Sequence, residues 1–122
     1  MNKREVWVRG ETVAREYLRA NGFSILAENY TGRIGEIDLI AREGETIVFV
    51  EVKARENTAF GQPIEAITPY KVRKIVLTAQ QYLVSKRLLD HDVRFDVIEV
   101  LCGEVIHTKN AFSMNDAAKF YK

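Results

Sequence analysis

The sequence predicts an α/β fold in which helices flank a mixed β-sheet, in the order helix, three strands, helix, two strands. Two segments with helical periodicity, residues 6–21 and 69–83, interrupt segments whose apolar and polar residues alternate as in β-strands. A long helix that crosses over the sheet allows the strands before and after it to pair in parallel. The 122 residues, 47% of them hydrophobic, suffice for one domain, residues 1–122, with its own core.

The first predicted helix runs from Val6 to Asn21, and its apolar residues recur on one helical face. Gly22 stands where a glycine commonly ends a helix. Because Gly10 weakens the first turns, we expect the helix to begin later than Val6.

A first strand is predicted over residues 23–29, and a loop with two glycines follows over residues 30–35. Tyr30 and Arg33 in this loop are candidates for nucleic-acid contacts, through stacking on a base and pairing with a phosphate respectively. The alternative is that both side chains anchor the loop.

Residues 35–53 are predicted to form a β-hairpin, because two alternating segments rich in β-branched residues flank a glycine-containing turn. A two-residue loop at Gly44 and Glu45 suits a type II′ turn. This loop sets the register of the whole hairpin. The predicted pairs are Glu43–Thr46, Ile40–Phe49, Asp38–Glu51 and Glu36–Lys53.

This register places two carboxylates, Asp38 and Glu51, side by side on otherwise apolar strands. Like charges directly opposite each other destabilise a sheet, so a divalent cation, a raised pKa on one acid, or full solvent exposure beside Lys53 must compensate. A solvated sheet face with a surface ion pair is the alternative to a metal site. Ile40 and Phe49 on the same face argue for the metal site.

The segment after the hairpin, residues 54–63, has few apolar residues and is predicted to be a substrate-contacting loop whose best-placed cation is Arg55. The second long helix is predicted to begin with Thr68 as N-cap and Pro69 at its first position. Its periodicity extends to Leu83.

The first two turns of this helix carry Lys71, Arg73 and Lys74. Cations there oppose the helix dipole, but together with the helix N-terminus they form a corner that attracts phosphate. The alternative is that they are exposed and tolerated at a small cost. A strand over residues 93–101, apolar on both faces, is predicted to be central. A last strand covers residues 105–109, and the tail beyond it is open between a short helix and a docked coil.

Asp38 and the triplet Glu51-Val52-Lys53 resemble the signature of the PD-(D/E)xK nuclease superfamily. The wider sequence resembles the small bacterial YraN family, whose fold is similar to archaeal Holliday junction resolvases. The segments that carry this resemblance are residues 35–41, residues 49–55, Phe60-Gly61-Gln62-Pro63, Lys71 and Arg94-Phe95-Asp96. It implies a restriction-endonuclease-like (resolvase-like) core. The Gln-x-x-x-Tyr motif of the recombination nucleases is absent, which favours the resolvase-like branch.

The resemblance implies a metal-dependent DNA endonuclease that hydrolyses phosphodiester bonds, with selectivity for branched DNA. Mg²⁺ or Mn²⁺ is the expected cofactor, held by Asp38, Glu51 and a first-helix glutamate, which is Glu11 or, as the fallback, Glu16. Lys53 is expected to orient or help deprotonate the attacking water, so that the catalytic residues are Asp38, Glu51 and Lys53.

The formal net charge is only +1, but its distribution is uneven. Residues 28–51 contain six acidic and two basic residues, whereas residues 69–90 contain five basic and one acidic residue. An acidic centre beside a basic helix suits phosphodiester chemistry on DNA. The candidate nucleic-acid-binding residues are Arg33, Arg55, Lys71, Arg73 and Lys74.

Cys102 is the only cysteine, which excludes an internal disulfide and a cysteine-based zinc site. No apolar run approaches 18 residues and nothing resembles a signal peptide, so we expect a cytoplasmic protein without membrane contacts. The rival hypotheses are a non-catalytic nucleic-acid-binding module that retains the nuclease fold and a protein-interaction domain. Whether the chain is a monomer or a homodimer is open.

Overall fold

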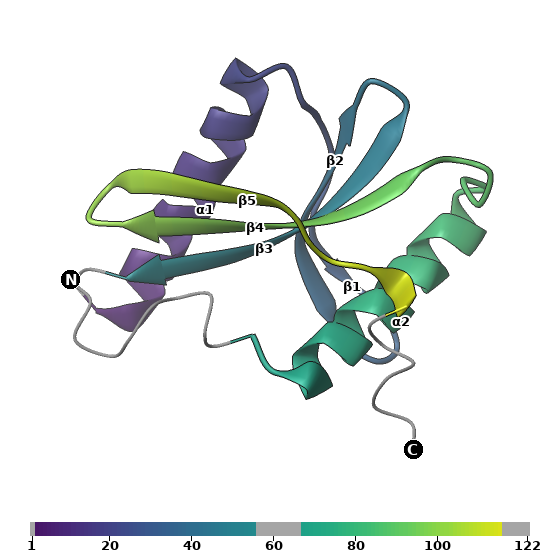
Figure 1. Ribbon diagram of the computed structural model, residues 1–122. Helices are drawn as coiled ribbons and strands as arrows, with labels where there is room; N and C mark the ends of the chain where they lie inside the picture. Colours follow the sequence, from purple (N-terminus) through teal and green to yellow (C-terminus); the bar gives the residue numbers. More distant parts are fainter. Residues whose placement is uncertain (1, 56–66, 116–122) are drawn as a thin grey trace.

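The computed structural model describes residues 2–55 and 67–115, which form an α/β fold with a five-stranded mixed sheet (Figure 1). This confirms the predicted fold class and element order. The elements are α1 (Lys3–Ala20), β1 (Ser24–Thr31), β2 (Glu36–Glu43), β3 (Thr46–Arg55), α2 (Pro69–Ser85), β4 (Val93–Leu101) and β5 (Glu104–Phe112). The segment predicted to contact substrate beyond Arg55, and the end of the tail, lie outside the described residues.

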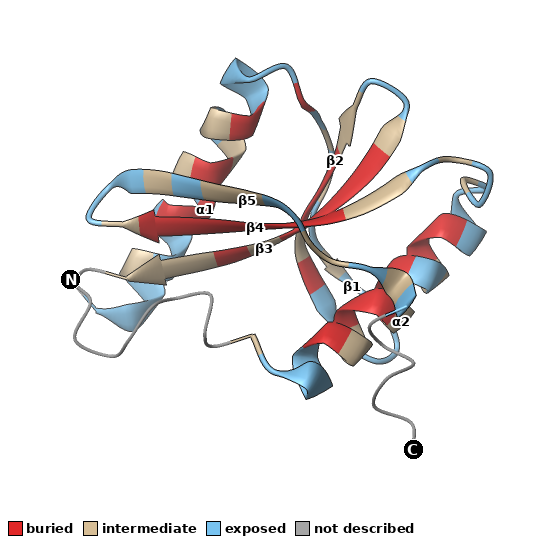
Figure 2. Ribbon diagram, viewed as in Figure 1, coloured by how far each residue is buried: buried red, intermediate tan, exposed pale blue. Residues whose placement is uncertain are grey.

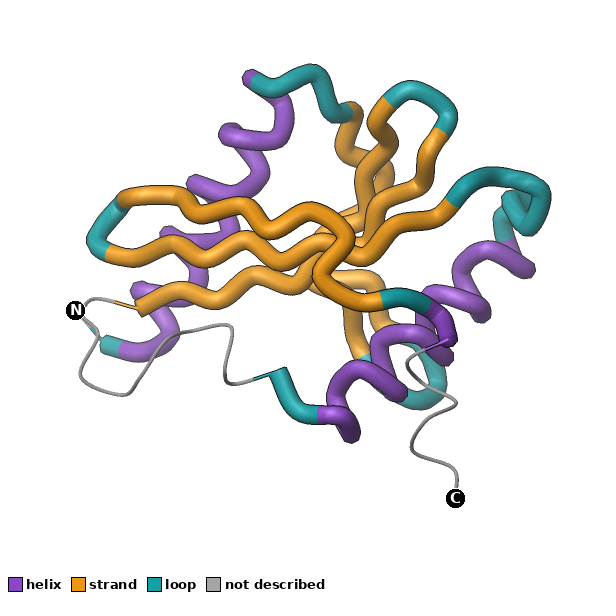
Figure 3. The backbone as a smooth tube through the Cα atoms, viewed as in Figure 1, coloured by secondary structure: helices purple, strands orange, loops and turns teal. Residues whose placement is uncertain are grey.

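The strands follow one another across the sheet in the order β1-β2-β3-β4-β5. All neighbours are antiparallel except β3 and β4, which are parallel because α2 crosses over between them. Figure 3 shows β1 and β2 running at a steep angle to β3, β4 and β5, so the sheet is strongly twisted. This twist opens the sheet between β2 and β3 at one end.

The two helices cover opposite faces of the sheet. Phe49 packs in a core with Ile75 and Tyr82 of α2, whereas the next residue, Val50, packs in a core with Leu18 of α1. Successive residues of a strand point to opposite faces, so each helix buries one side of β3. The buried residues accordingly line both helices where they meet the sheet (Figure 2).

Helix α1 begins at Lys3, so the expectation of a start after Val6 is wrong. The side chain of Asn2 caps the helix by accepting a hydrogen bond from the Glu5 N–H at 2.8 Å. Gly10 does not delay the start of the helix but is a packing position, because a Cβ atom there would collide with the Cβ of Ala54 in β3. Close contact with the sheet therefore offsets the low helix propensity of glycine, about 1 kcal/mol.

The predicted start of α2 is confirmed. Thr68 accepts a hydrogen bond from the Lys71 N–H at 3.2 Å, and Pro69 occupies the first turn. Strand β4 is buried along most of its length, as predicted. Strand β5 is longer than predicted and includes residues 110–112, which settles the start of the tail as strand. In the part of the chain that the structure describes, no helix is both long and apolar enough to cross a membrane.

Candidate active site

The β2–β3 hairpin has the predicted register near its turn but not at its far end. Glu43 pairs with Thr46 and Ile40 with Phe49, as predicted, and regular pairing continues to Leu39 and Val50. Beyond that point the strands diverge, so the predicted ladder pairs Asp38–Glu51 and Glu36–Lys53 do not form. The twist of the sheet explains the divergence, since β3 continues along β4 while β2 turns away.

The Asp38 carboxylate bridges the gap that this divergence leaves. Its Oδ2 atom accepts a hydrogen bond from the Val52 N–H at 2.8 Å, in place of a backbone partner. The carboxyl groups of Asp38 and Glu51 also share a hydrogen bond, although the two residues are not ladder partners. The meeting of these two acids, predicted from the hairpin, is therefore present with a different backbone geometry.

Both carboxyl groups are largely buried, and their pKa values are raised. Burial raises the pKa of Glu51 to about 7, and the negative charge of Asp38 adds to the rise. Burial also raises the pKa of Asp38, against the opposing effects of the Val52 N–H, the Glu51 hydrogen bond and Lys53. The alternative of a fully solvated sheet face is wrong, because the side chains of Glu51 and Lys53 are only 15% and 16% exposed.

Lys53 completes a compact group of charges with the two acids. Its Nζ atom lies 3.6 Å from Oε1 of Glu51. Burial lowers the pKa of the Lys53 amine, and contact with the Lys71 amine lowers it further, while Glu51 raises it. Lys71 comes from the first turn of α2 and also acts on the charge of Glu51. The crossover helix thus brings a second cation to the acids of the hairpin.

Of the two candidate glutamates of α1, only Glu11 is directed toward these acids. Glu11 is buried and accepts a hydrogen bond from the Asn29 side chain at 3.0 Å. Burial raises the pKa of Glu11, and the charge of Asp38 contributes to the rise. Glu16 is exposed and pairs instead with Arg15 and Arg19.

The donor set suits a magnesium ion that keeps part of its water shell. Mg²⁺ is usually held by one or two carboxylates together with waters and substrate phosphates, which matches the pair Asp38 and Glu51. Among residues 2–55 and 67–115 there is no group of three or more His, Cys, Asp or Glu side chains poised around one metal position. Glu11 therefore acts on the pair at longer range in this structure.

Two of the candidate phosphate-binding cations, Lys71 and Lys74, lie in the first two turns of α2, and Lys71 acts on the charge of Glu51. The Lys74 amine lies 4.7 Å from the centre of the Tyr70 ring. Arg33 lies in the loop against α2, where its backbone N–H donates to the Gln81 side chain at 3.0 Å. Arg73 is half-buried on α2.

Arg55 is not gathered with these cations, since it lies at the end of β3 and lines a pocket against α1. Tyr30 packs edge-to-face on Tyr82, with ring centroids 5.2 Å apart, so it anchors the loop.

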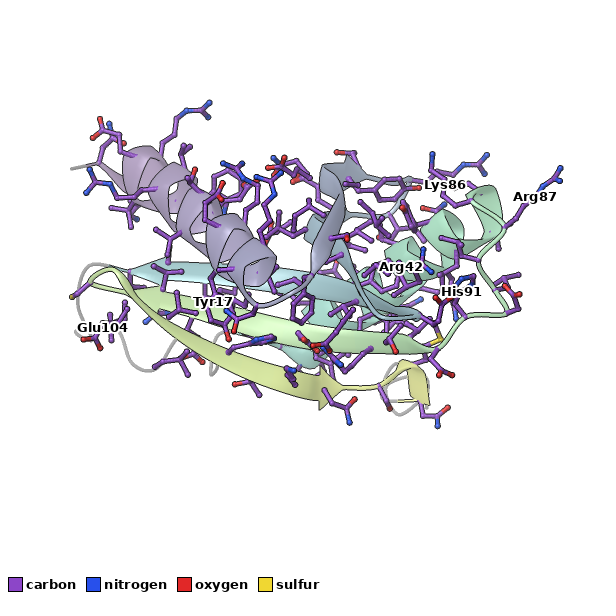
Figure 4. All side chains as sticks on the ribbon, turned by 90° about the horizontal axis from the view of Figure 1, so that it is seen from above. Tyr17, Arg42, Lys86, Arg87, His91 and Glu104 are labelled. Carbon is purple, nitrogen blue, oxygen red and sulfur yellow. The ribbon has the colours of Figure 1, made fainter. Side chains whose placement is uncertain are left out.

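Sequence reasoning missed a second charged network on the α1 side of the sheet, which we call the Asp96 network. Asp96 is fully buried and accepts hydrogen bonds from Arg94 at 2.8 and 3.0 Å and from the Asn110 N–H at 3.0 Å. His107 Nε2 lies 2.7 Å from the same carboxylate, and its Nδ1 lies 3.1 Å from the Tyr17 hydroxyl. Tyr17 extends from α1 toward the strands (Figure 4).

The alternation in β4 was a usable signal for part of this network, because Arg94 and Asp96 share one face of an apolar strand. The contact with His107 depends on the pairing of β5 with β4, which the sequence did not define. Another buried acid, Glu99, is the β4 neighbour of Lys53 and was also missed.

Comparison with known proteins places the chain in a defined group of sequences. The model of the uncharacterised protein family UPF0102 matches residues 10–100. A UPF0102 protein of Persephonella marina is 45% identical over 112 residues, which cover 89% of this chain and 97% of the relative. Another from Lachnoclostridium phytofermentans is 49% identical over 113 residues, covering 92% and 96%. A third from Geotalea daltonii is 47% identical over 110 residues, covering 86% and 87%.

Proposed function

The chain belongs to the uncharacterised protein family UPF0102, which confirms the predicted relation to YraN, and we propose that it is a metal-dependent DNA endonuclease. The observation that carries this proposal is the buried pair Asp38 and Glu51 with Lys53 beside it. Two neighbouring buried carboxyl groups with raised pKa values, next to an amine with a lowered pKa, are arranged at a cost in stability. Such perturbed groups cluster at functional sites.

In this proposal Asp38 and Glu51 hold Mg²⁺ or Mn²⁺ in their deprotonated forms, as metal ligands must be. The bound cation would supply an activated water and stabilise the charge that develops on the phosphoryl oxygens. The Val52 N–H fixes the Asp38 carboxylate in a defined position beside Glu51. The backbone of β3 thereby orients one ligand while it carries the other.

Lys53 holds or moves a proton at its Nζ atom. Because burial and Lys71 both lower the pKa of this amine, it accepts and releases a proton more readily near neutral pH than an exposed lysine. In its charged form it stabilises negative charge on the phosphate. Lys71 and the adjoining turn of α2 bind a phosphate oxygen and help to place the scissile bond.

The second candidate function is a non-catalytic nucleic-acid-binding module with the same fold. The observation that favours it is the absence, within the described parts of the chain, of a compact third ligand beside Asp38 and Glu51. The two candidates differ in one measurable property, which is the cutting of DNA.

The experiment that tests the proposal is a cleavage assay with supercoiled, linear and branched DNA in Mg²⁺ or Mn²⁺. We expect wild-type protein to nick or cut at least one of these substrates, to prefer the branched one, and to lose activity in a chelator. The matched control is Glu51→Gln, which keeps the side-chain volume and removes the charge. Cutting of equal rate by wild type and Glu51→Gln would identify a contaminant. DNA binding without any cutting would favour the non-catalytic module.

A further inference from the structure

A groove of about 710 Å³ runs between the loop that joins β1 to β2 and the outer face of α2. Its loop wall includes Arg33 and Ile34, and its helix wall includes Leu77, Gln81 and Val84. Val84 and Ile34 are exposed apolar side chains, so the groove presents apolar surface to solvent. The proposed catalytic reaction does not account for this surface.

The groove has fixed walls because the loop is pressed against the helix. The Gln81 side chain accepts a hydrogen bond from the Arg33 N–H at 3.0 Å. A Cβ atom at Gly32 would collide with the same Gln81 oxygen, and one at Gly35 would come within 3.4 Å of the Thr78 hydroxyl. At Gly32 any larger residue would displace the Gln81 side chain that holds the loop, whereas Gly35 only packs closely on α2.

Both walls lead to the candidate active site. The loop wall continues directly into β2, which carries Asp38 four residues after Ile34. The helix wall continues toward the start of α2, where Lys71 contacts the Lys53 amine. The groove is thus a path away from the acids rather than a separate pocket.

Leu77, Gln81 and Val84 line the groove, and Tyr70 and Lys74 continue their stripe of α2 toward the active site. The whole stripe is about 20 Å long, given a rise of about 1.5 Å per residue. Its members are spaced as neighbours on one helical face: Tyr70, Lys74, Leu77, Gln81 and Val84. At the active-site end Tyr70 is 63% exposed, and the Lys74 amine lies 4.7 Å from the centre of its ring. An exposed aromatic ring beside a cation is a surface on which a base can stack.

The charge of the helix fits a polyanion. Helix α2 contains three basic residues and no acidic residue, and Arg33 faces it from the loop. Cations along an apolar groove complement a nucleic-acid strand, because the cations pair with its phosphates and the apolar surface contacts its bases. In a duplex the faces of the bases are stacked and hidden, so apolar and aromatic contacts of this kind require unpaired bases.

We propose that this groove binds a single-stranded nucleic-acid segment that extends from the acid–lysine site along α2. The inference deepens the proposed endonuclease function and rests on it for the nature of the chemistry. It defines the substrate class as DNA in which at least one strand is unpaired beside the bond to be cut. Bases stack on Tyr70 and contact Val84, while Lys74 and Arg33 contact phosphates.

The test is fluorescence anisotropy in a chelator, with a labelled oligothymidine strand of about 20 nucleotides and a duplex of equal length. Val84→Glu introduces a negative charge into the groove, and Leu89→Glu introduces the same charge outside it. The two positions are matched, with 60% and 65% of the side chain exposed. We expect Val84→Glu to weaken single-strand binding about tenfold and Leu89→Glu less than about twofold.

A second pair of variants does not depend on charge. Tyr70→Ala removes the stacking ring and is expected to weaken single-strand binding about fivefold or more, whereas Tyr70→Phe keeps the ring and the affinity. Thermal melts of all four variants verify that they fold.

Equal losses for Val84→Glu and Leu89→Glu, or a duplex bound as tightly as the single strand, overturn the inference. The cleavage assay separates it from the proposed function. If the protein cuts DNA but Val84 and Tyr70 do not contribute to binding, the endonuclease proposal stands and the proposed role of the groove is wrong. Binding that depends on Val84 without any cutting supports the groove in a non-catalytic module.

Discussion

Two buried groups of charges lie on opposite faces of the same sheet, and they differ in how their carboxylates are compensated. In the Asp96 network, burial by itself would raise the pKa of Asp96, but Arg94, the Asn110 N–H and His107 together lower it. In the candidate active site, burial raises the pKa of Glu51 to about 7 and that of Asp38 as well. Hydrogen-bond partners thus lower the pKa of the first carboxylate, whereas burial raises the pKa values of the second pair.

This difference separates structure from function. A buried charge that is fully hydrogen-bonded, such as Asp96, joins α1, β4 and β5 into one unit. Two neighbouring buried carboxyl groups with raised pKa values, such as Asp38 and Glu51, oppose the folded state when both are charged, and such groups are concentrated at functional sites. Substitutions in the two regions are therefore expected to have opposite consequences.

The largest expected effect is on catalysis and is confined to the candidate active site. Lys53→Met should lower the rate of DNA nicking by about 10²- to 10⁴-fold, because Lys53 acts on the transition state. Its melting temperature and DNA affinity should remain close to those of wild type. The matched variant in the other region is Tyr17→Phe, which should nick at the wild-type rate. Equal rates for Lys53→Met and wild type would exclude the assigned role.

The largest effect on stability is expected in the Asp96 network. Asp96→Asn removes the charge that pairs with Arg94 inside the protein, and breaking a buried pair costs about 3–5 kcal/mol of unfolding free energy. Denaturation by urea, monitored by circular dichroism, measures this loss. Asp38→Asn is the comparison and should stabilise the metal-free protein, since it removes a like charge while the amide oxygen still accepts from Val52. A loss of similar size in both variants would contradict the distinction between the two regions.

The dependence of stability on pH should also differ between the regions. The pKa of Glu51 rises from an ordinary value near 4.5 to about 7 on folding, so the folded protein binds the proton more tightly. The free energy of unfolding of metal-free protein should therefore fall between about pH 5 and pH 8, by about 2–3 kcal/mol relative to Glu51→Gln. Asp96 has a lowered pKa, so its contribution is lost only in acid. Denaturation curves at several pH values measure the loss of stability above pH 5 and the loss in acid. If the stability of wild type and of Glu51→Gln changed with pH in the same way, the predicted contribution of Glu51 would be refuted.

Metal binding should recover the stability that the two charged acids cost the folded protein. At a hundredfold excess over its Kd, Mg²⁺ or Mn²⁺ should stabilise the wild-type protein by about 2.7 kcal/mol, because it binds the folded state alone. Asp38→Asn should abolish this gain, whereas Tyr17→Phe should retain it. Thermal melts with and without metal provide the measurement. An identical response of wild type and Asp38→Asn would eliminate the site.

The smallest expected effect is that of a single hydrogen bond. Tyr17→Phe removes the hydroxyl that lies 3.1 Å from His107 and should cost about 1 kcal/mol of unfolding free energy. The ring keeps its edge-to-face contact with His107, so packing is unchanged. Urea denaturation of this variant gives the contribution of one hydrogen bond, against which the loss in Asp96→Asn can be compared. A loss of unfolding free energy as large as that of Asp96→Asn would show that the Asp96 network is disrupted as a whole when one member is changed.

Local chemistry in the sequence determined much of this protein. Thr68 and Pro69 defined the start of α2, and the Gly44–Glu45 loop defined the hairpin register near the turn. The hairpin also predicted that Asp38 and Glu51 lie close together, although the two acids meet outside the regular ladder. Each of these features depends on residues within a few positions of one another or across one turn, so periodicity, capping and turn chemistry are sufficient to predict them.

The tertiary structure alone decided the features that join distant elements. Helix α1 begins at Lys3 although Gly10 lies within it, because Gly10 packs against Ala54. Because the sheet twists, the predicted pairs at the end of the hairpin do not form, and the Asp38 side chain accepts a hydrogen bond from the Val52 N–H instead.

The contact of Lys71 with Lys53 depends on how the crossover helix docks on the sheet. The contact of His107 with Asp96 depends on how the last strand docks on it. Docking is set by the packing of complete faces, and no local pattern in the sequence encodes it.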